Sequence, residues 1–217
     1  AGFTNASVDL LCGVPGQALA DIEQALDTLS AFPITHLSCY LLTLPPHHKM
    51  YKELPNEDEQ LEHLLFVDSW MTSRGFDHYE ISNYARGPAM QARHNLVYWR
   101  GQSYLGLGPS AHSFDGKSKR RWKNVSSLHR YAEMLGRSVL PQEQEEALTA
   151  DQLDLEKWLL GVRLSEGFPR AWLQTDFQKK RAAQLIEHGF LIEGGAGLRL
   201  TGRGFAMSDS IIRQLSG

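Results

Sequence analysis

The stretch from His78 to Phe114 carries residue types that could bind a ligand. In the run RHNLVYW, His94 and Asn95 stand close to two large aromatic residues, Tyr98 and Trp99. A neutral imidazole can ligate haem iron, and an aromatic ring can stack on a flat macrocycle. The spacing contains no CxxC or HxxxH pattern, so it does not indicate a zinc site. On spacing alone, the favoured alternative for His94 is a histidine that hydrogen-bonds a neighbouring loop.

A carboxylate, Asp9, interrupts the apolar run 7–11, which predicts a buried strand. A buried carboxylate must be paired or must face a polar ligand, because burying an isolated charge is costly. A ligand contact and a structural salt bridge are therefore equal interpretations of Asp9. Glu80 has the same two interpretations.

Two further runs are weaker candidates. The run from Gly106 to Ala111 lacks bulky side chains, which indicates a bulge or a close backbone approach by a ligand. It does not match the dinucleotide or phosphate-loop fingerprints. The basic run 117–123 could hold propionates or phosphates through charge-assisted hydrogen bonds, but a solvated hairpin tip is the favoured interpretation.

Strand and helix patterns alternate through the first half of the chain. Strands are expected at 7–12, 36–43, 78–85 and within 104–114, and helices at 19–32 and 57–75. Such alternation predicts parallel strands joined by crossover helices, with ligands at the carboxyl ends of the strands. The loops expected to share that rim are 13–17, 43–48, 82–86 and 110–113.

The second half reads as a smaller, mostly helical unit. A short helix at 126–135 and an acidic linker at 141–150 precede it. Its expected elements are helices at 153–164 and 177–188, a hairpin formed by 189–193 and 198–201, and a last helix at 202–215. We therefore predict an α/β domain over 1–140 and a helical, winged-helix-like domain over 150–217.

The composition of the chain argues against several classes of protein. The chain has 217 residues, a formal net charge of −3 and a pI of about 6.3, which argue against a general attraction to nucleic acid or anionic membranes. No apolar run approaches the roughly 20 residues of a membrane span. Cys12 and Cys39 form no CxxC, and we expect buried, reduced thiols in a cytoplasmic protein.

Four motifs in order resemble the oxygen-independent coproporphyrinogen III oxidase family of radical S-adenosylmethionine proteins. They are VDLLCGVPGQ at 8–17, HYEISNYA at 78–85, HNLVYW at 94–99 and YLGLGPSAHSF at 104–114. The resemblance covers essentially the whole chain, and the HNLVYW element is similar to the HemW branch of haem chaperones.

The resemblance implies part of a radical S-adenosylmethionine (β/α) barrel, followed by the winged-helix-like unit. Asp9 matches the family's strand carboxylate that contacts S-adenosylmethionine, and Thr43 and His112 match positions that line the same cofactor pocket. His94 matches the histidine implicated in haem handling, with Tyr98 and Trp99 as stacking groups.

The family's CxxxCxxC motif, which holds a four-iron, four-sulfur cluster, does not occur in these 217 residues. Two separated cysteines cannot supply three cluster ligands. We therefore expect a longer parent protein with the cluster motif upstream of Ala1, and no radical chemistry from these residues alone.

The predicted function is that of a haem chaperone, which binds haem and delivers it to haem-accepting proteins. The rival is a coproporphyrinogen III oxidase, and a nucleic-acid-binding winged helix is a third, disfavoured reading. A barrel lacking some of its strands exposes a sheet edge, so homodimer formation is a further hypothesis.

Overall fold

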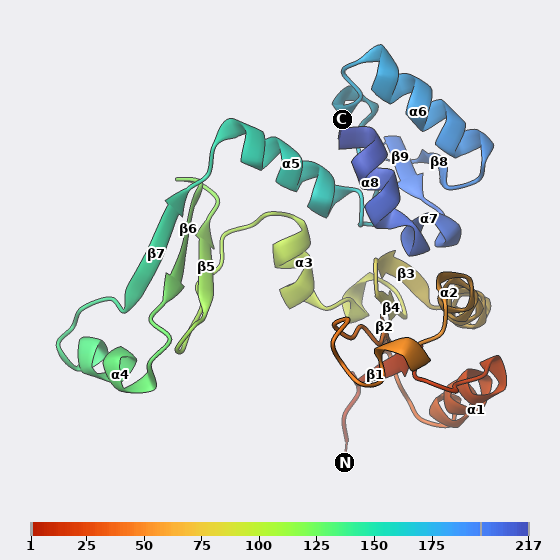
Figure 1. The fold of residues 1–217 in the computed structure, drawn as a ribbon, viewed down its shortest axis with the longest axis horizontal. Coiled ribbons are helices and arrows are strands. Elements are labelled where there is room, and N and C mark those ends of the chain that lie inside the picture. The colour runs from red at the N-terminus through yellow and green to blue at the C-terminus, as the bar shows by residue number, and fades with distance from the viewer. Residues whose placement is uncertain (1, 196, 217) are drawn as a thin grey trace. The chain divides into compact units, whose positions relative to one another are not determined.

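A computed structural model of the chain describes residues 2–195 and 197–216 (Figure 1). The chain divides into two compact units. The first contains residues up to Gln91 together with those from Val162 onward, and the second is Ala92–Gly161. These units do not coincide with the predicted domains 1–140 and 150–217, because the C-terminal residues pack on the N-terminal sheet.

A four-stranded sheet forms the centre of the first unit, in the order β1-β2-β4-β3. Its strands are β1 (Ser7–Cys12), β2 (His36–Leu41), β3 (Asp77–Glu80) and β4 (Asn83–Ala85). The predicted parallel pairing is found between β1 and β2, with Leu10 opposite Cys39. β4, however, runs antiparallel to both of its neighbours.

The prediction of a single strand at 78–85 is wrong. The chain turns at Ile81 and Ser82, so that β3 and β4 form a hairpin, with a bulge between His78 and Glu80. Ser and Asn favour turns because their side chains hydrogen-bond the local backbone. The Ser82 carbonyl also accepts a 2.7 Å hydrogen bond from the Cys39 amide of β2, which ties the turn to the sheet.

Two helices build the core of this unit, α1 (Leu19–Ser30) and α2 (Glu57–Ser73). Alternate strand residues point to the core, as the period of two requires. The fully buried members of the core cluster are Cys12, Ile22, Leu26, Leu37, Val67 and Met71. Asn56 caps α2 by accepting from the amides of Asp58 and Glu59, each at 3.0 Å.

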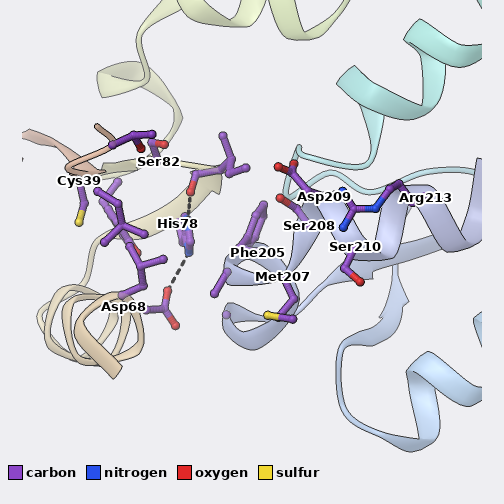
Figure 2. Close-up of a pocket in the computed structure, with 17 residues that line it drawn as sticks. Cys39, Asp68, His78, Ser82, Phe205, Met207, Ser208, Asp209, Ser210 and Arg213 are labelled. Carbon is purple, nitrogen blue, oxygen red and sulfur yellow. Dashed lines mark hydrogen bonds and ion pairs between the residues drawn. The ribbon is translucent and has the colours of Figure 1, made fainter. Parts of the chain in front are cut away.

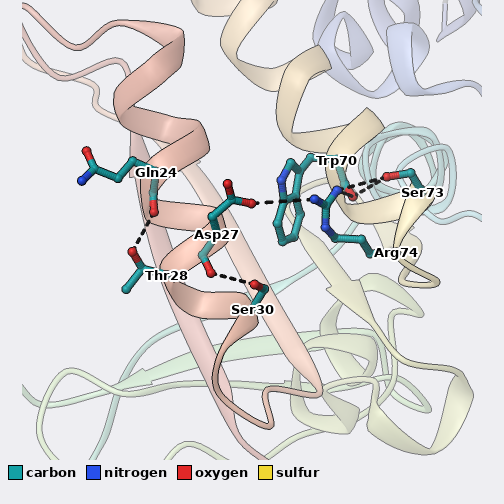
Figure 3. Close-up of polar contacts among 7 residues, drawn as sticks. All are labelled: Gln24, Asp27, Thr28, Ser30, Trp70, Ser73 and Arg74. Atoms are coloured by element: carbon teal, nitrogen blue, oxygen red, sulfur yellow. Dashed lines mark hydrogen bonds and ion pairs between the residues drawn. The ribbon is translucent and has the colours of Figure 1, made fainter.

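At the surface, Arg74 connects the two helices (Figure 3). Its guanidinium lies 3.7 Å from the centre of the Trp70 ring and 3.7 Å from Oδ1 of Asp27. Both charged side chains are largely exposed, so the ion pair adds little, and apolar burial holds α1 against α2.

The C-terminal part of the first unit contains α6 (Asp176–Glu187), the hairpin β8 (Leu191–Gly194) and β9 (Gly197–Leu200), α7 (Gly202–Ala206) and α8 (Ser208–Ser216). Within it, α6 packs on α8 and on β8. The helix predicted at 153–164 as the start of the winged-helix-like domain corresponds to α5 (Ala150–Gly161), which belongs to the second unit. The predicted last helix is interrupted at Met207. The Ser165 amide donates to the Tyr79 carbonyl at 3.0 Å, which attaches this part to β3.

The second unit contains an antiparallel sheet in the order β5-β6-β7. Its elements are α3 (Arg93–Trp99), β5 (His112–Asp115), β6 (Arg120–Asn124), α4 (Leu128–Gly136), β7 (Gln142–Ala147) and α5 (Ala150–Gly161). The acidic linker predicted at 141–150 is wrong, since β7 pairs with the basic strand β6 and Glu145 lies 2.8 Å from Arg120. The loop 110–113 belongs to this unit.

Short 3₁₀ helices occur at Tyr51–Glu53, Pro88–Met90 and Arg170–Trp172. Over residues 2–195 and 197–216, no helix combines the length and the apolar character that crossing a bilayer requires.

Candidate functional site

Helix α3 presents His94 and Tyr98 on one side, because residues four apart are neighbours on a helix surface. The phenolic oxygen of Tyr98 lies 3.1 Å from Nε2 of His94. The two rings meet edge to face, with centroids 4.9 Å apart and planes at 87°. Both side chains are exposed, so the imidazole is open to a ligand.

Trp99 takes a different position. It follows His94 by five residues, which places it about 140° away around the helix axis, and it is partly buried. Tyr98 therefore shares a helix face with His94, whereas Trp99 does not.

A row of aromatic rings continues from Tyr98 within the second unit. The Tyr98 and Tyr104 rings meet at 4.6 Å, and the Tyr104 and Phe114 rings lie 6.4 Å apart. Tyr104 and Phe114 exchange two backbone hydrogen bonds, of 2.9 and 3.0 Å, which fixes the row. Partial burial raises the pKa of Tyr104, although Arg121 acts against that shift. The imidazole thus stands beside a rigid aromatic surface.

This arrangement suits reversible binding of a metal-containing aromatic ligand. If the Tyr98 hydroxyl donates to Nε2, the ring proton resides on Nδ1, and the Nε2 lone pair is directed at the phenol. A metal ion at Nε2 then competes with one neutral hydrogen bond, which contributes only about 1 kcal/mol. His94 can therefore exchange its partner at low cost.

Asp9 is exposed on β1, and the expectation of a buried carboxylate is wrong. The period of two directs Leu10 and Cys12 to the core, so Asp9 faces outward. In the described part of the chain, Asp9 makes no hydrogen bond or ion pair, and its oxygens are available to a polar ligand. The same sheet face carries Ser38, opposite Asp9 in the register, and His36.

A hydrogen-bonded chain through buried His36 and Tyr79 on that face was not predicted. The Ser7 hydroxyl lies 2.8 Å from Nδ1 of His36, and the Tyr79 hydroxyl lies 2.8 Å from its Nε2. Burial lowers the pKa of His36, against a raising effect of Asp9, so the neutral ring is favoured. Glu80 is also buried on this face, and it accepts a hydrogen bond from Asn83.

The other residues predicted for S-adenosylmethionine are on other elements. Thr43 follows β2 and lines a cavity with Leu41 and Ser82, shown in Figure 2, which Asp9 does not line. His112 is exposed at the start of β5, in the other compact unit. No cavity within one unit gathers Asp9, Thr43 and His112 among the residues that the structure describes.

The residues present do not fit an iron-sulfur cluster. Cys12 and Cys39 are buried, free thiols, as predicted, with sulfur atoms 3.7 Å apart. Within the described ranges, no group of three His, Cys, Asp or Glu side chains is placed to hold a metal ion.

The two weaker sequence candidates have structural explanations. A Cβ on Gly106 would collide with the His112 carbonyl oxygen, so the close approach there is made by the chain itself. The basic run forms the turn between β5 and β6 and the strand β6, and its Arg120 and Arg121 pair with Glu145 and Glu156.

Comparison with known proteins places these features in a family, although no family model matches the chain. The chain is 35% identical over 223 residues to the heme chaperone HemW of Mycobacterium tuberculosis, covering 100% of the chain and 56% of that protein. It is 32% identical over 173 residues to HemW of Bacillus subtilis, covering 76% of the chain and 45% of that protein.

The fold matches a solved structure, the coproporphyrinogen III oxidase HemN of Escherichia coli, a radical SAM enzyme. The TM-score is 0.71 at 19% identity, covering 99% of this chain and 55% of the other. The architecture is therefore that of part of a radical S-adenosylmethionine protein. The chain belongs to the HemW/HemN-like family of these proteins, and it spans about half the length of the curated relatives it matches.

Proposed function

We propose that the protein is a haem chaperone, which binds haem and transfers it to haem-accepting proteins in the cytoplasm. Its similarity to proteins named heme chaperone extends over the whole chain in the Mycobacterium tuberculosis relative. The observation that carries the proposal is the exposed imidazole of His94, with Tyr98 on its Nε2 and an aromatic row beside it.

In this proposal, His94 supplies the axial ligand to haem iron through Nε2. The iron replaces the Tyr98 hydroxyl at Nε2 when haem binds, and the hydroxyl replaces the iron when haem leaves, so that binding stays reversible. The Tyr98 ring contacts the porphyrin. Because the imidazole is exposed, an acceptor protein has access to the bound haem. Trp99, also predicted as a stacking group, would act from another side of α3.

We further propose that the whole protein, of which these residues match about half, uses S-adenosylmethionine and a four-iron, four-sulfur cluster. Asp9, with its unengaged carboxylate, is the strongest candidate in this chain for contacting S-adenosylmethionine, and Thr43 and His112 are the other two. The buried thiols of Cys12 and Cys39 are not candidates for the cluster.

Titration with haemin, followed by its Soret absorption, tests the role of His94. We expect His94→Ala to weaken haem binding and change the spectrum. The matched control is His129→Ala, which removes an exposed histidine from helix α4 of the same unit and should leave the titration unchanged. Identical titrations for wild type and His94→Ala would remove His94 from the proposal.

The alternative function is oxidative decarboxylation of coproporphyrinogen III. The similarity of fold to HemN is the observation that favours it. The whole protein, with its cluster reconstituted without oxygen, separates the two. Product formation from coproporphyrinogen III supports the oxidase, whereas haem retention and delivery to apomyoglobin without turnover support the chaperone.

A further inference from the structure

A cavity of about 440 Å³ lies within the first unit, on the side of the sheet that faces α2 and the C-terminal helices (Figure 2). Its lining comes from the end of β2, from α2, from the β3–β4 turn and from α7 and α8. The volume is that of a small-molecule site. The cavity belongs to a different unit from His94.

One end of the cavity is formed by the first turn of α8, a helix of 9 residues. The amides in a first helical turn lack intrahelical acceptors and carry the positive end of the helix dipole. The Ile211 amide donates to the Met207 carbonyl at 3.1 Å, which closes the first turn of α8. The residues before Ile211, Ser208 to Ser210, line the cavity.

Ser208 provides an independent indication of a ligand. It lines the cavity, its exposed fraction is only 3%, and its hydroxyl makes no hydrogen bond within residues 2–195 and 197–216. A hydroxyl that lines a cavity and has no protein partner is free to donate to a bound acceptor. Ser210 accepts from the Gln214 amide at 3.4 Å, which leaves its own O–H available.

The charges around the cavity favour an anion at this end. Arg213 stands one turn further along α8 and extends toward Ser208 and Asp209 (Figure 2). Both carboxylates of the lining are already engaged. Nδ1 of His78 lies 2.7 Å from Asp68, and the Arg163 guanidinium donates to Asp209. Arg213 makes no ion pair in the part of the chain that the structure describes.

The rest of the lining combines apolar side chains with polar ones, which include Thr43, Ser82 and Tyr84. Leu41, Leu64 and Met207 contribute aliphatic surface, and the Phe205 ring lies tilted against that of His78, with centroids 4.2 Å apart. A Cβ on Gly202 would meet the Asp68 carboxylate, so α7 approaches that side chain of α2 closely here.

We propose that this cavity binds a small amphipathic anion, with an apolar body against Phe205 and Met207 and one carboxylate or phosphate at the start of α8. The amides of the first turn, the Ser208 hydroxyl and the Arg213 guanidinium would hold the anionic group. The site is independent of the haem proposal, since it uses none of the residues of α3.

Binding of matched probes to the 217-residue chain tests the proposal. Naphthalene-2-carboxylate and 2-naphthyl phosphate carry the anion, and neutral naphthalene-2-carboxamide has the same ring system. Calorimetry should detect the anions and much weaker binding of the carboxamide. Amide resonances of Ser208, Asp209 and Ser210 should shift on titration. The preferred anion distinguishes a carboxylate ligand from a phosphate ester.

Two variants distinguish loss of anion binding from loss of the fold. Arg213→Gln should weaken binding of the anions about tenfold, as expected for loss of a charge-assisted hydrogen bond. Ser208→Ala should weaken binding of the anions roughly fivefold. Arg137→Gln removes an exposed arginine from the other unit and should change nothing. Because Arg213 is exposed, its variant should fold even if Ser208→Ala does not.

Three results would overturn the proposal: no binding of either anion, equal binding of the carboxamide, or unchanged affinity in Arg213→Gln. Haemin titration of Arg213→Gln should match the wild type, and His94→Ala should bind naphthalene-2-carboxylate normally. Failure of the haem proposal would therefore leave this test intact.

Discussion

The phenolic oxygen of Tyr98 lies 3.1 Å from Nε2 of His94, one turn along α3. This contact occupies the nitrogen that we propose as the iron ligand, so the phenol and the iron compete for one lone pair. The Tyr98 hydroxyl would then limit how tightly haem is held, which suits a protein that must release it.

Tyr98→Phe should therefore tighten haem binding. Removing a competing neutral hydrogen bond is expected to lower the Kd roughly 2- to 10-fold and to slow haem delivery to apomyoglobin. Tyr51→Phe, an exposed tyrosine of the first unit, is the control. Weaker haem binding by Tyr98→Phe would mean that the hydroxyl itself contacts the ligand.

The hydrogen-bonded chain Ser7–His36–Tyr79, in which His36 is buried, predicts a pH dependence of stability. Burial lowers the pKa of His36 in the folded protein below its ordinary value of 6.5, so the unfolded chain takes up the proton first. The stability contributed by neutral His36 is complete above pH 6.5 and is lost as the pH falls through the lowered, folded value.

Urea unfolding of wild type and His36→Gln at about pH 7.5 and about pH 5.5 measures this effect. The wild type should lose more of its free energy of unfolding on acidification than His36→Gln does. Equal losses in the two proteins would show that His36 does not titrate differently in the folded and unfolded states.

The packing of α1 on α2 should depend on buried side chains and not on the ion pair at its surface. Leu26→Ala deletes a fully buried side chain and should reduce the free energy of unfolding by about 2–5 kcal/mol. Asp27→Asn breaks the exposed contact with Arg74 and should cost less than about 1 kcal/mol. Comparable losses in the two variants would reverse this ranking.

Strand β1 is the edge of the first sheet in the described structure, with β2 as its neighbour. An edge strand offers unpaired backbone groups to another chain, and we predict concentration-dependent homodimerisation through it. Leu11 is 46% exposed on β1, and Leu11→Lys should shift the equilibrium to monomer. Light scattering that finds only monomer over a wide concentration range would rule out this dimer.

Sequence patterns predicted the elements whose periodicity is long and regular. The helices α1, α2 and α6, the strand β1 and the β8–β9 hairpin lie close to the predicted residues. The patterns failed where the pairing of one strand with another decides the structure. The acidic residues of β7 resemble a linker until basic β6 is placed beside them, and the turn at Ser82 falls in a short run of alternating residues that resembles one strand.

The candidate site was predictable in the same uneven way. The pairing of His94 with Tyr98 follows from a spacing of four once residues 93–99 are known to be helical, and the same helix separates Trp99 from them. The chain Ser7–His36–Tyr79 joins residues 29 and 43 positions apart. Only strand pairing brings them together, and no local pattern signals it.

The most direct test of the haem proposal is pulsed electron paramagnetic resonance of the ferric haem complex, prepared with ¹⁵N-labelled histidine. A bound imidazole gives a ¹⁵N hyperfine coupling to the iron. We predict this coupling in the wild type and in His129→Ala, and its loss in His94→Ala. A coupling that persists in His94→Ala, or that is missing from the wild-type complex, would contradict iron ligation by His94.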